Sequence, residues 1–138
     1  MSLMTRVEKM SEPLLIEVEH RDDVCILHLK GRVVTNADPE LVHALDEIKS
    51  RNCYRLLVDL RDVLMIGSTG IGFLVGLYTS ITKIPGGRFV LVGPNQRVRD
   101  VLDLTRLSTI IQLAPAMASG LAALQAESAQ VMDVAQAR

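Results

Sequence analysis

A short segment near the middle of the chain holds the residues whose types and spacing are best suited to chemistry. It consists of Gly67, Ser68, Thr69, Gly70, Ile71 and Gly72. Glycines allow a backbone to turn tightly or to approach a ligand closely, and the two hydroxyl groups offer a nucleophile or an acceptor for a modifying group. The segment follows an apolar run and precedes a helical pattern, so we expect it between a strand and a helix. Three hypotheses about its chemistry compete.

The first hypothesis is a dinucleotide site, because glycines between a strand and a helix let a pyrophosphate approach the helix N-terminus. The rest of that constellation is missing. The next expected strand, residues 88–92, is followed by Gly93 and Pro94 rather than by an acidic residue that could hold a ribose. We also expect no space for a second nucleotide-binding half before residue 138. The glycine pattern alone therefore supports this hypothesis weakly.

The second hypothesis makes Ser68 the nucleophile of a hydrolase. A nucleophile elbow needs Gly-x-Ser-x-Gly, whereas this chain has Gly-Ser-Thr-Gly. A nucleophilic serine also needs a base. The candidate bases all precede the serine: His20, His28 and His43. None has an evident orienting carboxylate, so we expect that the chain is not an enzyme.

The third hypothesis is that Ser68 is modified by another protein. It lies where the N-cap of a helix belongs, with Thr69 beside it as a second candidate. A phosphate there would meet backbone N–H groups and the positive end of the helix dipole, and it would add about −1.5 to −2 charges. Residues 63–82 contain no Asp, Glu, Lys or Arg. The added charge would therefore dominate the local field and could control a protein–protein contact, unless Ser68 is only a cap.

The elements that must position this segment follow from the hydrophobic pattern. Five segments are expected strands: residues 14–19, 24–30, 55–60, 88–92 and 109–113. Gly31 is expected to end the second of them. Helical patterns follow Asp38, Ser68, Asn95 and Ala116, with Pro39 suited to a first helical position. Strands that alternate with helices predict an open α/β sheet whose parallel part is covered on both faces.

The helix expected at residues 68–82 carries two sets of apolar side chains. One set is expected to face the sheet: Ile71, Leu74, Val75, Tyr78 and Ile81. Phe73 and Leu77 lie off that face. We favour a core position for both, because a helix on a sheet can be broadly apolar. The alternative is a small exposed apolar patch beside Ser68, where a partner would dock.

The composition excludes several classes of function. A net charge of −1 argues against a general nucleic-acid binder. Residues 63–82 and 107–126 are charge-free runs long enough to cross a bilayer. Both contain glycines and polar residues, however, so we expect buried strand and helix segments and no membrane insertion. No basic region followed by an apolar region opens the chain, so we expect a cytoplasmic protein.

The residues typical of metal and redox sites are scattered along the sequence. Cys25 and Cys53 lie far apart, each among apolar residues, and we interpret them as small buried thiols rather than as a disulfide or metal pair. No histidine has ligand spacing with them, so no metal or cofactor is expected. Asp59 and Asp62 are interpreted as solvated residues at a strand end.

The central segment resembles a motif of a known family. Residues 58–72 run Val-Asp-Leu-Arg-Asp-Val-Leu-Met-Ile-Gly-Ser-Thr-Gly-Ile-Gly. This is similar to the central motif of the sulfate-transporter and anti-sigma-factor-antagonist (STAS) domain, roughly Val-Asp-Leu-Ser-x-Val-x-Phe-Ile-Asp-Ser-Ser-Gly-Leu-Gly. The likeness continues in other segments in the right order: residues 27–32, 86–94, 98–102 and 104–107. It therefore covers nearly the whole chain.

The resemblance implies a fold and its boundaries. It implies a single-domain STAS-like α/β fold at residues 14–126, in which about four helices pack on a mixed sheet of four to five strands. Residues 1–13 would form a flexible N-terminal arm. Residues 127–138 would form a C-terminal helix extension or tail.

The resemblance also implies a function, that of an anti-sigma factor antagonist. The unphosphorylated form of such a protein binds an anti-sigma factor that is also a serine kinase, and so frees the sigma factor. The kinase phosphorylates the first Ser of Asp-Ser-Ser-Gly, which breaks the complex, and a phosphatase resets it. Ser68 matches that acceptor and Thr69 matches the second Ser. The residues expected to bind the partner are Gly67, Ser68, Thr69, Gly70, Ile71, Gly72 and Phe73.

The chain departs from the family pattern at two positions. The Asp before the acceptor is Gly67, which removes a carboxylate together with its repulsion of a phosphate. The usual Thr-Gly-Leu is Thr105-Arg106-Leu107. Gly67 favours an alternative function, a STAS accessory protein of a transporter or stress-signalling complex without a phosphorylation cycle. A nucleotide-binding protein that uses residues 67–72 is the alternative from another class.

Overall fold

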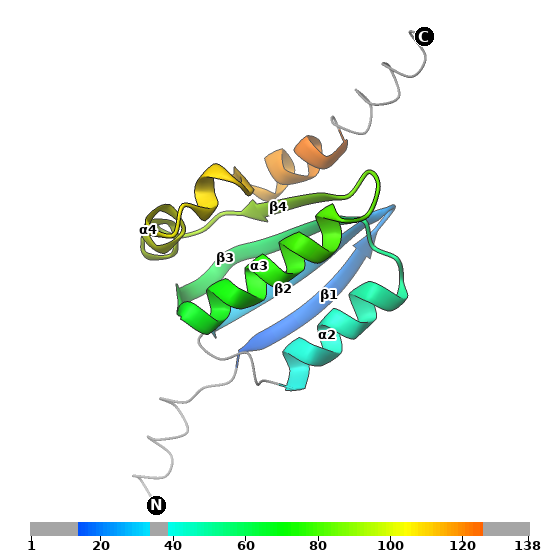
Figure 1. Ribbon diagram of the computed structural model, residues 1–138. Coiled ribbons are helices and arrows are strands. Elements are labelled where there is room, and N and C mark those ends of the chain that lie inside the picture. Colours follow the sequence, from blue (N-terminus) through cyan, green and yellow to red (C-terminus); the bar gives the residue numbers. More distant parts are fainter. Residues whose placement is uncertain (1–13, 34–38, 126–138) are drawn as a thin grey trace, which may run out of the picture.

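Five strands form one sheet, in the order in which they occur along the chain (Figure 1). They are β1 (Leu15–Arg21), β2 (Val24–Val33), β3 (Arg55–Ile66), β4 (Arg88–Val92) and β5 (Gln112–Ala114). β1 pairs antiparallel with β2, and every later pair is parallel. The computed structural model describes residues 14–33 and 39–125. The expected N-terminal arm, the Asp38 cap and the C-terminal extension lie outside those residues.

Helices cover both faces of the sheet. α2 (Pro39–Ser50) and α3 (Ser68–Thr82) lie side by side on one face (Figure 1). α4 (Gln96–Leu104) packs its buried side chains into the same core. The chain then passes through a 3-10 turn, η1 (Leu107–Thr109), and β5 to a helix at residues 117–125, which packs on the opposite face. The expected α/β domain with a five-stranded mixed sheet and four helices is thus confirmed in the described part of the chain.

Side chains that alternate along the central strand, β3, enter the two hydrophobic clusters on opposite faces of the sheet. Leu56, Val58 and Leu60 point into the larger cluster under α2, α3 and α4, whereas Leu57 belongs to the cluster under the last helix. All four side chains are fully buried. Burial on both faces explains why this strand is a nearly continuous apolar run in the sequence.

β2 and β3 run at least three residues beyond the ends that their sequence patterns predict. β2 passes through Gly31 and ends at Val33, so the expectation that Gly31 ends the strand is wrong. Gly31 has φ of 111°, and the β2–β3 register shifts there, which is how a bulge absorbs an extra residue without ending the pairing. β3 continues beyond Leu60 to Ile66. β3 therefore leads directly into Gly67, which lies beside Val33 at the end of β2.

The inner face of α3 differs in part from the expected one. The buried residues are Gly70, Phe73, Leu74, Leu77 and Ile81. The core position favoured for Phe73 and Leu77 is therefore confirmed, whereas Val75 is 38% exposed and does not face the sheet as expected. The rotation follows from Gly70, which packs closely on the ends of the strands and turns its side of the helix inward.

The turn around α4 accommodates one departure from the family pattern. Asn95 caps α4 as expected, because its Oδ1 accepts a hydrogen bond from the backbone N–H of Val98 at 2.8 Å. Arg106 takes the position of the family glycine and adopts the left-handed conformation, with φ of 63°. A non-glycine residue in that region is strained, so the turn is retained at some cost.

Among the described helices, none has the length and apolar content that a bilayer span requires.

Candidate functional site

The N-terminus of α3 lies at the end of β3, where a single residue connects the strand to the helix. The backbone N–H of Gly67 donates to the carbonyl oxygen of Val33 at 2.9 Å, and the N–H of Ile71 donates to the Gly67 carbonyl at 2.9 Å. Gly67 is therefore the N-cap, and Ser68 is the first helical residue. This corrects the expectation that Ser68 itself occupies the cap. Because Gly67 has no side chain, no side chain caps the helix.

The glycines of this segment do not form an open loop. A Cβ atom on Gly70 would lie 2.2 Å from the carbonyl oxygen of Val33 and 2.7 Å from a side-chain carbon of Ile66. The first turn of α3 therefore packs directly on the ends of β2 and β3. Gly72 faces the other way, because a Cβ atom there would meet nothing within 4 Å. This close packing leaves no glycine cradle for a pyrophosphate, so the geometry does not favour the dinucleotide hypothesis.

The seven residues expected to bind a partner divide into two groups. Gly70 and Phe73 are buried beneath the helix, so the structure removes them from the accessible face. Ser68 and Gly72 are exposed, and the remaining three are partly exposed. The accessible group, hereafter the Ser68 surface, consists of Gly67, Ser68, Thr69, Ile71 and Gly72. Its hydroxyl groups lie at the positive end of a helix whose first turn contains no acidic residue.

A charged cluster that the sequence did not indicate lies in the middle of the sheet. Asp59 is only 3% exposed, which contradicts its interpretation as a solvated turn residue. Its carboxylate accepts hydrogen bonds from Nδ1 of His28 at 2.7 Å and from Nε of Arg61 at 2.9 Å. Nε2 of His28 donates to Glu19 at 2.8 Å. The expectation that no carboxylate orients a histidine is therefore wrong for His28.

The three titrating groups of this cluster stabilise one another in their charged forms. Burial opposes the charge of His28, but the hydrogen bonds to Glu19 and Asp59 outweigh it and raise the pKa of the imidazole. Burial likewise opposes ionisation of Asp59, yet the hydrogen bonds from Arg61 and His28 lower the pKa of that carboxyl group. The hydrogen bond from His28 also lowers the pKa of Glu19. Such mutual support is typical of a structural ion network.

Comparison with known proteins places the chain in a family. Residues 16–120 match the family model described as the STAS domain. This chain belongs to the STAS domain family. It is 29% identical over 101 residues to a protein of Paenibacillus polymyxa named anti-sigma F factor antagonist, a match that covers 72% of this chain and 86% of that relative. It is also 29% identical over 99 residues to the anti-sigma-B factor antagonist of Listeria monocytogenes, covering 71% and 86% of the two chains.

A solved structure agrees with this family assignment. The crystal structure of an anti-sigma factor antagonist from Mycobacterium paratuberculosis superposes on this STAS domain with a TM-score of 0.73 at 25% sequence identity. The superposition covers 82% of this chain and 95% of that one. This STAS domain thus shares its overall fold with that protein.

The cysteines of this STAS domain are paired, which corrects their interpretation as separate thiols. Cys25 at the start of β2 and Cys53 just before β3 form a disulfide whose Cα atoms lie 5.9 Å apart. Their sequence separation of 28 positions obscured the pairing in the sequence. The parallel register explains it, because Cys25 pairs with Leu56 and so lies beside the residues that lead into β3.

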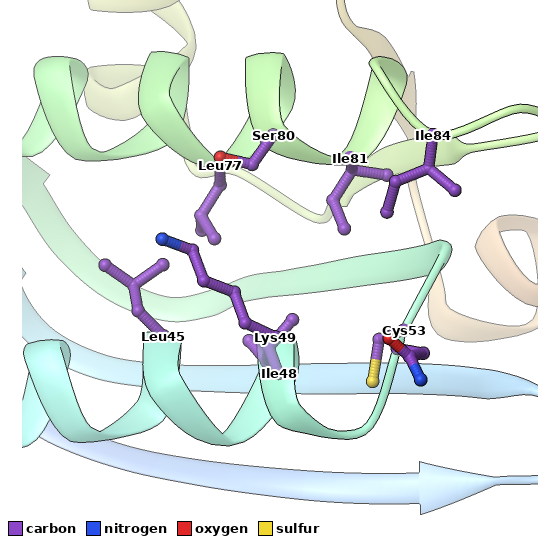
Figure 2. Close-up of a pocket in the computed structure, with 9 residues that line it drawn as sticks. Leu45, Ile48, Lys49, Cys53, Leu77, Ser80, Ile81 and Ile84 are labelled. Atoms are coloured by element: carbon purple, nitrogen blue, oxygen red, sulfur yellow. The ribbon is translucent and has the colours of Figure 1, made fainter.

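A small cavity opens between α2 and α3, near the end of α2. Its volume is about 110 Å³, and its walls are largely aliphatic. Figure 2 shows Leu45 and Lys49 of α2 and Leu77 and Ile81 of α3 directed into the space between the two helices. A larger groove of about 470 Å³ lies along His28 and Asp59. No residue of the Ser68 surface lines either of these two cavities.

Proposed function

We propose that this STAS domain is a cytoplasmic anti-sigma factor antagonist, and that phosphorylation of Ser68 breaks its complex with an anti-sigma factor that is also a serine kinase. The names of its relatives support the general function. The observation that carries the switch is the exposure of Ser68 at the first position of α3, on a helix that lacks any acidic or side-chain cap. The Ser68 surface is then the docking surface.

The switch requires no catalytic group in this chain. The kinase would transfer the γ-phosphoryl group of ATP to the Ser68 hydroxyl oxygen, which gives up its proton, and ADP would leave. A phosphatase would return Ser68 by hydrolysis of the phosphate ester. The STAS domain only presents the hydroxyl group, so we propose that it is a substrate and binding partner rather than an enzyme.

The effect of the phosphate differs between the free and the bound chain. In the free chain, the positive end of α3 tolerates the added charge of about −1.5 to −2. In the complex, the same charge would have to lose its water at an uncharged surface, which is costly unless the partner supplies cations. Phosphorylation would therefore weaken binding without unfolding the domain.

The glycine at the N-cap supports a second candidate function. Because Gly67 replaces the family carboxylate, a kinase that reads that carboxylate would lose a contact. The domain would then act as a STAS accessory subunit that binds its partner without a phosphorylation cycle. The two candidates share the Ser68 surface. They differ in the partner, which is an anti-sigma factor in the first and a transporter or stress-signalling complex in the second, and in whether Ser68 is modified.

A binding assay with matched variants tests the switch. The partner is an anti-sigma factor with serine kinase activity from the source organism, and binding is measured for the wild type, Ser68→Ala, Ser68→Asp and Ser80→Asp. Ser80 is an exposed serine near the other end of α3, so its variant controls for charge added to the same helix. We expect wild type, Ser68→Ala and Ser80→Asp to bind alike, and Ser68→Asp to bind at least about tenfold more weakly, or about 1.4 kcal/mol. Equal binding by all four would refute the switch.

Intact mass after incubation with the kinase and ATP distinguishes the candidates. A gain of one phosphate by the wild type and by Thr69→Ala, but not by Ser68→Ala, supports the switch at Ser68. No gain, together with tight binding, supports the accessory subunit. A thermal shift with dinucleotides tests the nucleotide-binding alternative, for which clear stabilisation would be required.

A further inference from the structure

Three potential metal ligands meet at the end of the sheet that carries the disulfide. Nδ1 of His20 and the sulfur atoms of Cys25 and Cys53 all lie within 4.8 Å of one another. They come from the end of β1, the start of β2 and the segment before β3, so the fold rather than the sequence spacing unites them. Nδ1 of His20 lies 3.3 Å from the Cys25 sulfur. Both cysteines are 5% exposed.

A fourth residue orients the histidine for this role. Nε2 of His20 lies 3.3 Å from Oε2 of Glu47, which α2 places beside the sheet. The carboxylate favours the tautomer with its proton on Nε2, which leaves the lone pair of Nδ1 directed at the sulfur atoms. A carboxylate behind a ligating histidine is the usual arrangement in protein metal sites. Arg51 lies 3.8 Å from the same carboxylate and helps to hold it.

We propose that, once the Cys25–Cys53 disulfide is reduced, His20, Cys25 and Cys53 bind one Zn²⁺ ion, with water at the fourth position. A dithiol reductant would deliver two electrons and two protons to the disulfide and would itself become a disulfide. Zn²⁺ would then displace the two thiol protons and bind the thiolates. The site lies at the opposite end of β3 from Ser68, and the proposal does not depend on the proposed function.

The geometry of the pair accommodates a metal ion. Zinc–sulfur bonds of about 2.3 Å at a tetrahedral centre place two thiolates about 3.8 Å apart. The Cα atoms are already 5.9 Å apart, so rotation of the side chains, with the backbone in place, can open the pair. Figure 2 shows the Cys53 sulfur directed toward the strands, away from the cavity between α2 and α3. The ion would therefore sit on the His20 side.

The charge and the ligand types favour zinc. Two thiolates, a neutral imidazole and Zn²⁺ sum to zero charge, which limits the cost of placing the ion beside buried sulfur atoms. Soft sulfur with imidazole nitrogen is the ligand set that zinc prefers over magnesium or calcium. The side chain of His20 is 29% exposed, so solvent can reach the fourth position.

Cobalt titration of the reduced chain tests the proposal. The chain is reduced with a phosphine, desalted without oxygen and titrated with Co²⁺ as a spectroscopic substitute for Zn²⁺. We expect one equivalent of Co²⁺ to bind with thiolate charge-transfer and tetrahedral ligand-field absorption, and Zn²⁺ to displace it. The oxidised chain should show neither absorption. A reduced chain that binds no Co²⁺ in this form would overturn the proposal.

Matched histidine variants establish which ligands take part. His20→Ala should weaken Co²⁺ binding more than tenfold, and Glu47→Gln should weaken it by about tenfold. His43→Ala removes an exposed histidine of α2 outside the cluster and should leave binding unchanged. Circular dichroism checks that each variant is folded. If folded His20→Ala binds as tightly as the wild type, the three-ligand site is wrong.

Discussion

The buried Asp59 offers a sharp test of how the sheet holds its charges. Asp59→Asn keeps the size of the side chain and removes its charge. The carboxylate accepts one hydrogen bond from His28 and three from Arg61, two from the guanidinium and one from the backbone N–H. An amide oxygen at the Oδ1 position can accept from the same backbone N–H, but the amide NH2, a donor, then replaces the oxygen that accepts from His28. The variant therefore removes both the charge and the acceptor that His28 uses.

The size of the effect follows from the exposure of the two partners. The guanidinium of Arg61 is half exposed, so solvent screens its pair and we expect less than about 1 kcal/mol from it. The His28 side chain is 24% exposed and faces a carboxylate that is nearly buried. A hydrogen bond to a charged group of this kind contributes about 1.5–3 kcal/mol. We therefore expect Asp59→Asn to lower the free energy of unfolding by about 2 kcal/mol at pH 6.

The same loss should depend on pH with a defined sign. The pKa of His28 is raised on folding. Its contribution to the free energy of unfolding is therefore complete below the ordinary pKa of about 6.5 and is lost as pH rises through the raised pKa. The pKa values of Asp59 and Glu19 are lowered, so their contributions are complete above about 4.3 and fade as pH falls through the lowered values. The ion network thus stabilises the domain most between about pH 4.5 and 6.5. Above the raised pKa of His28 only the half-exposed Arg61 pair of Asp59 remains charged, so at pH 9 we expect a loss of only about 1 kcal/mol.

Urea unfolding of the two chains at pH 6 and pH 9, followed by circular dichroism, measures both losses. Asp62→Asn is the matched control, because it removes an exposed carboxylate from the same strand and should change stability by less than about 0.5 kcal/mol. A loss from Asp59→Asn that is equal at the two pH values, or larger at pH 9, would refute the assignment of His28 as a charged partner.

Four further changes test the glycines of α3 and the disulfide. Gly70→Ala should destabilise the domain by about 2 kcal/mol, because the added methyl group would collide with the backbone of Val33. Gly76→Ala should stabilise it by about 1 kcal/mol, because the added methyl group would meet nothing within 4 Å and alanine favours the helix. Chemical denaturation measures both free energies of unfolding, and equal effects would contradict the packing of α3. Reduction of the Cys25–Cys53 disulfide in the presence of a chelator should cost about 3.5 kcal/mol for a 28-residue loop, and an unchanged urea midpoint would show that the disulfide does not constrain the chain. Gly67→Asp should raise the free energy of unfolding by a few tenths of a kcal/mol, because aspartate caps a helix better than glycine and φ of −99° suits any residue. A fall in melting temperature would contradict the assignment of Gly67 as the N-cap.

Much of the fold could be predicted from the sequence because its signals are local. Apolar runs predicted the strands, and for β4 the predicted and observed bounds are the same. Asn95 predicted the start of α4. The motif around Ser68 led to the family that the comparisons confirm. These features depend on neighbours within a few residues, which a single sequence displays directly.

The errors came from contacts between distant residues. The Asp59–His28 pair depends on the register of β2 against β3, and nothing local distinguishes Asp59 from a residue at a strand end. The Cys25–Cys53 pairing depends on the same register. The predicted inner face of α3 was partly wrong because Gly70, which we expected in a glycine-rich turn, packs closely on Val33. One signal was available for the charged cluster, since Asp59 lies between Val58 and Leu60, inside the apolar run at residues 56–60.

The most direct test of the proposed switch is the affinity of the same chain with and without phosphate on Ser68. The chain is phosphorylated to homogeneity, checked by intact mass, and titrated with the anti-sigma factor in a calorimeter beside the unmodified chain. The account predicts that the phosphorylated chain binds at least about tenfold more weakly while its circular dichroism is unchanged. Equal affinity of the two forms would contradict it.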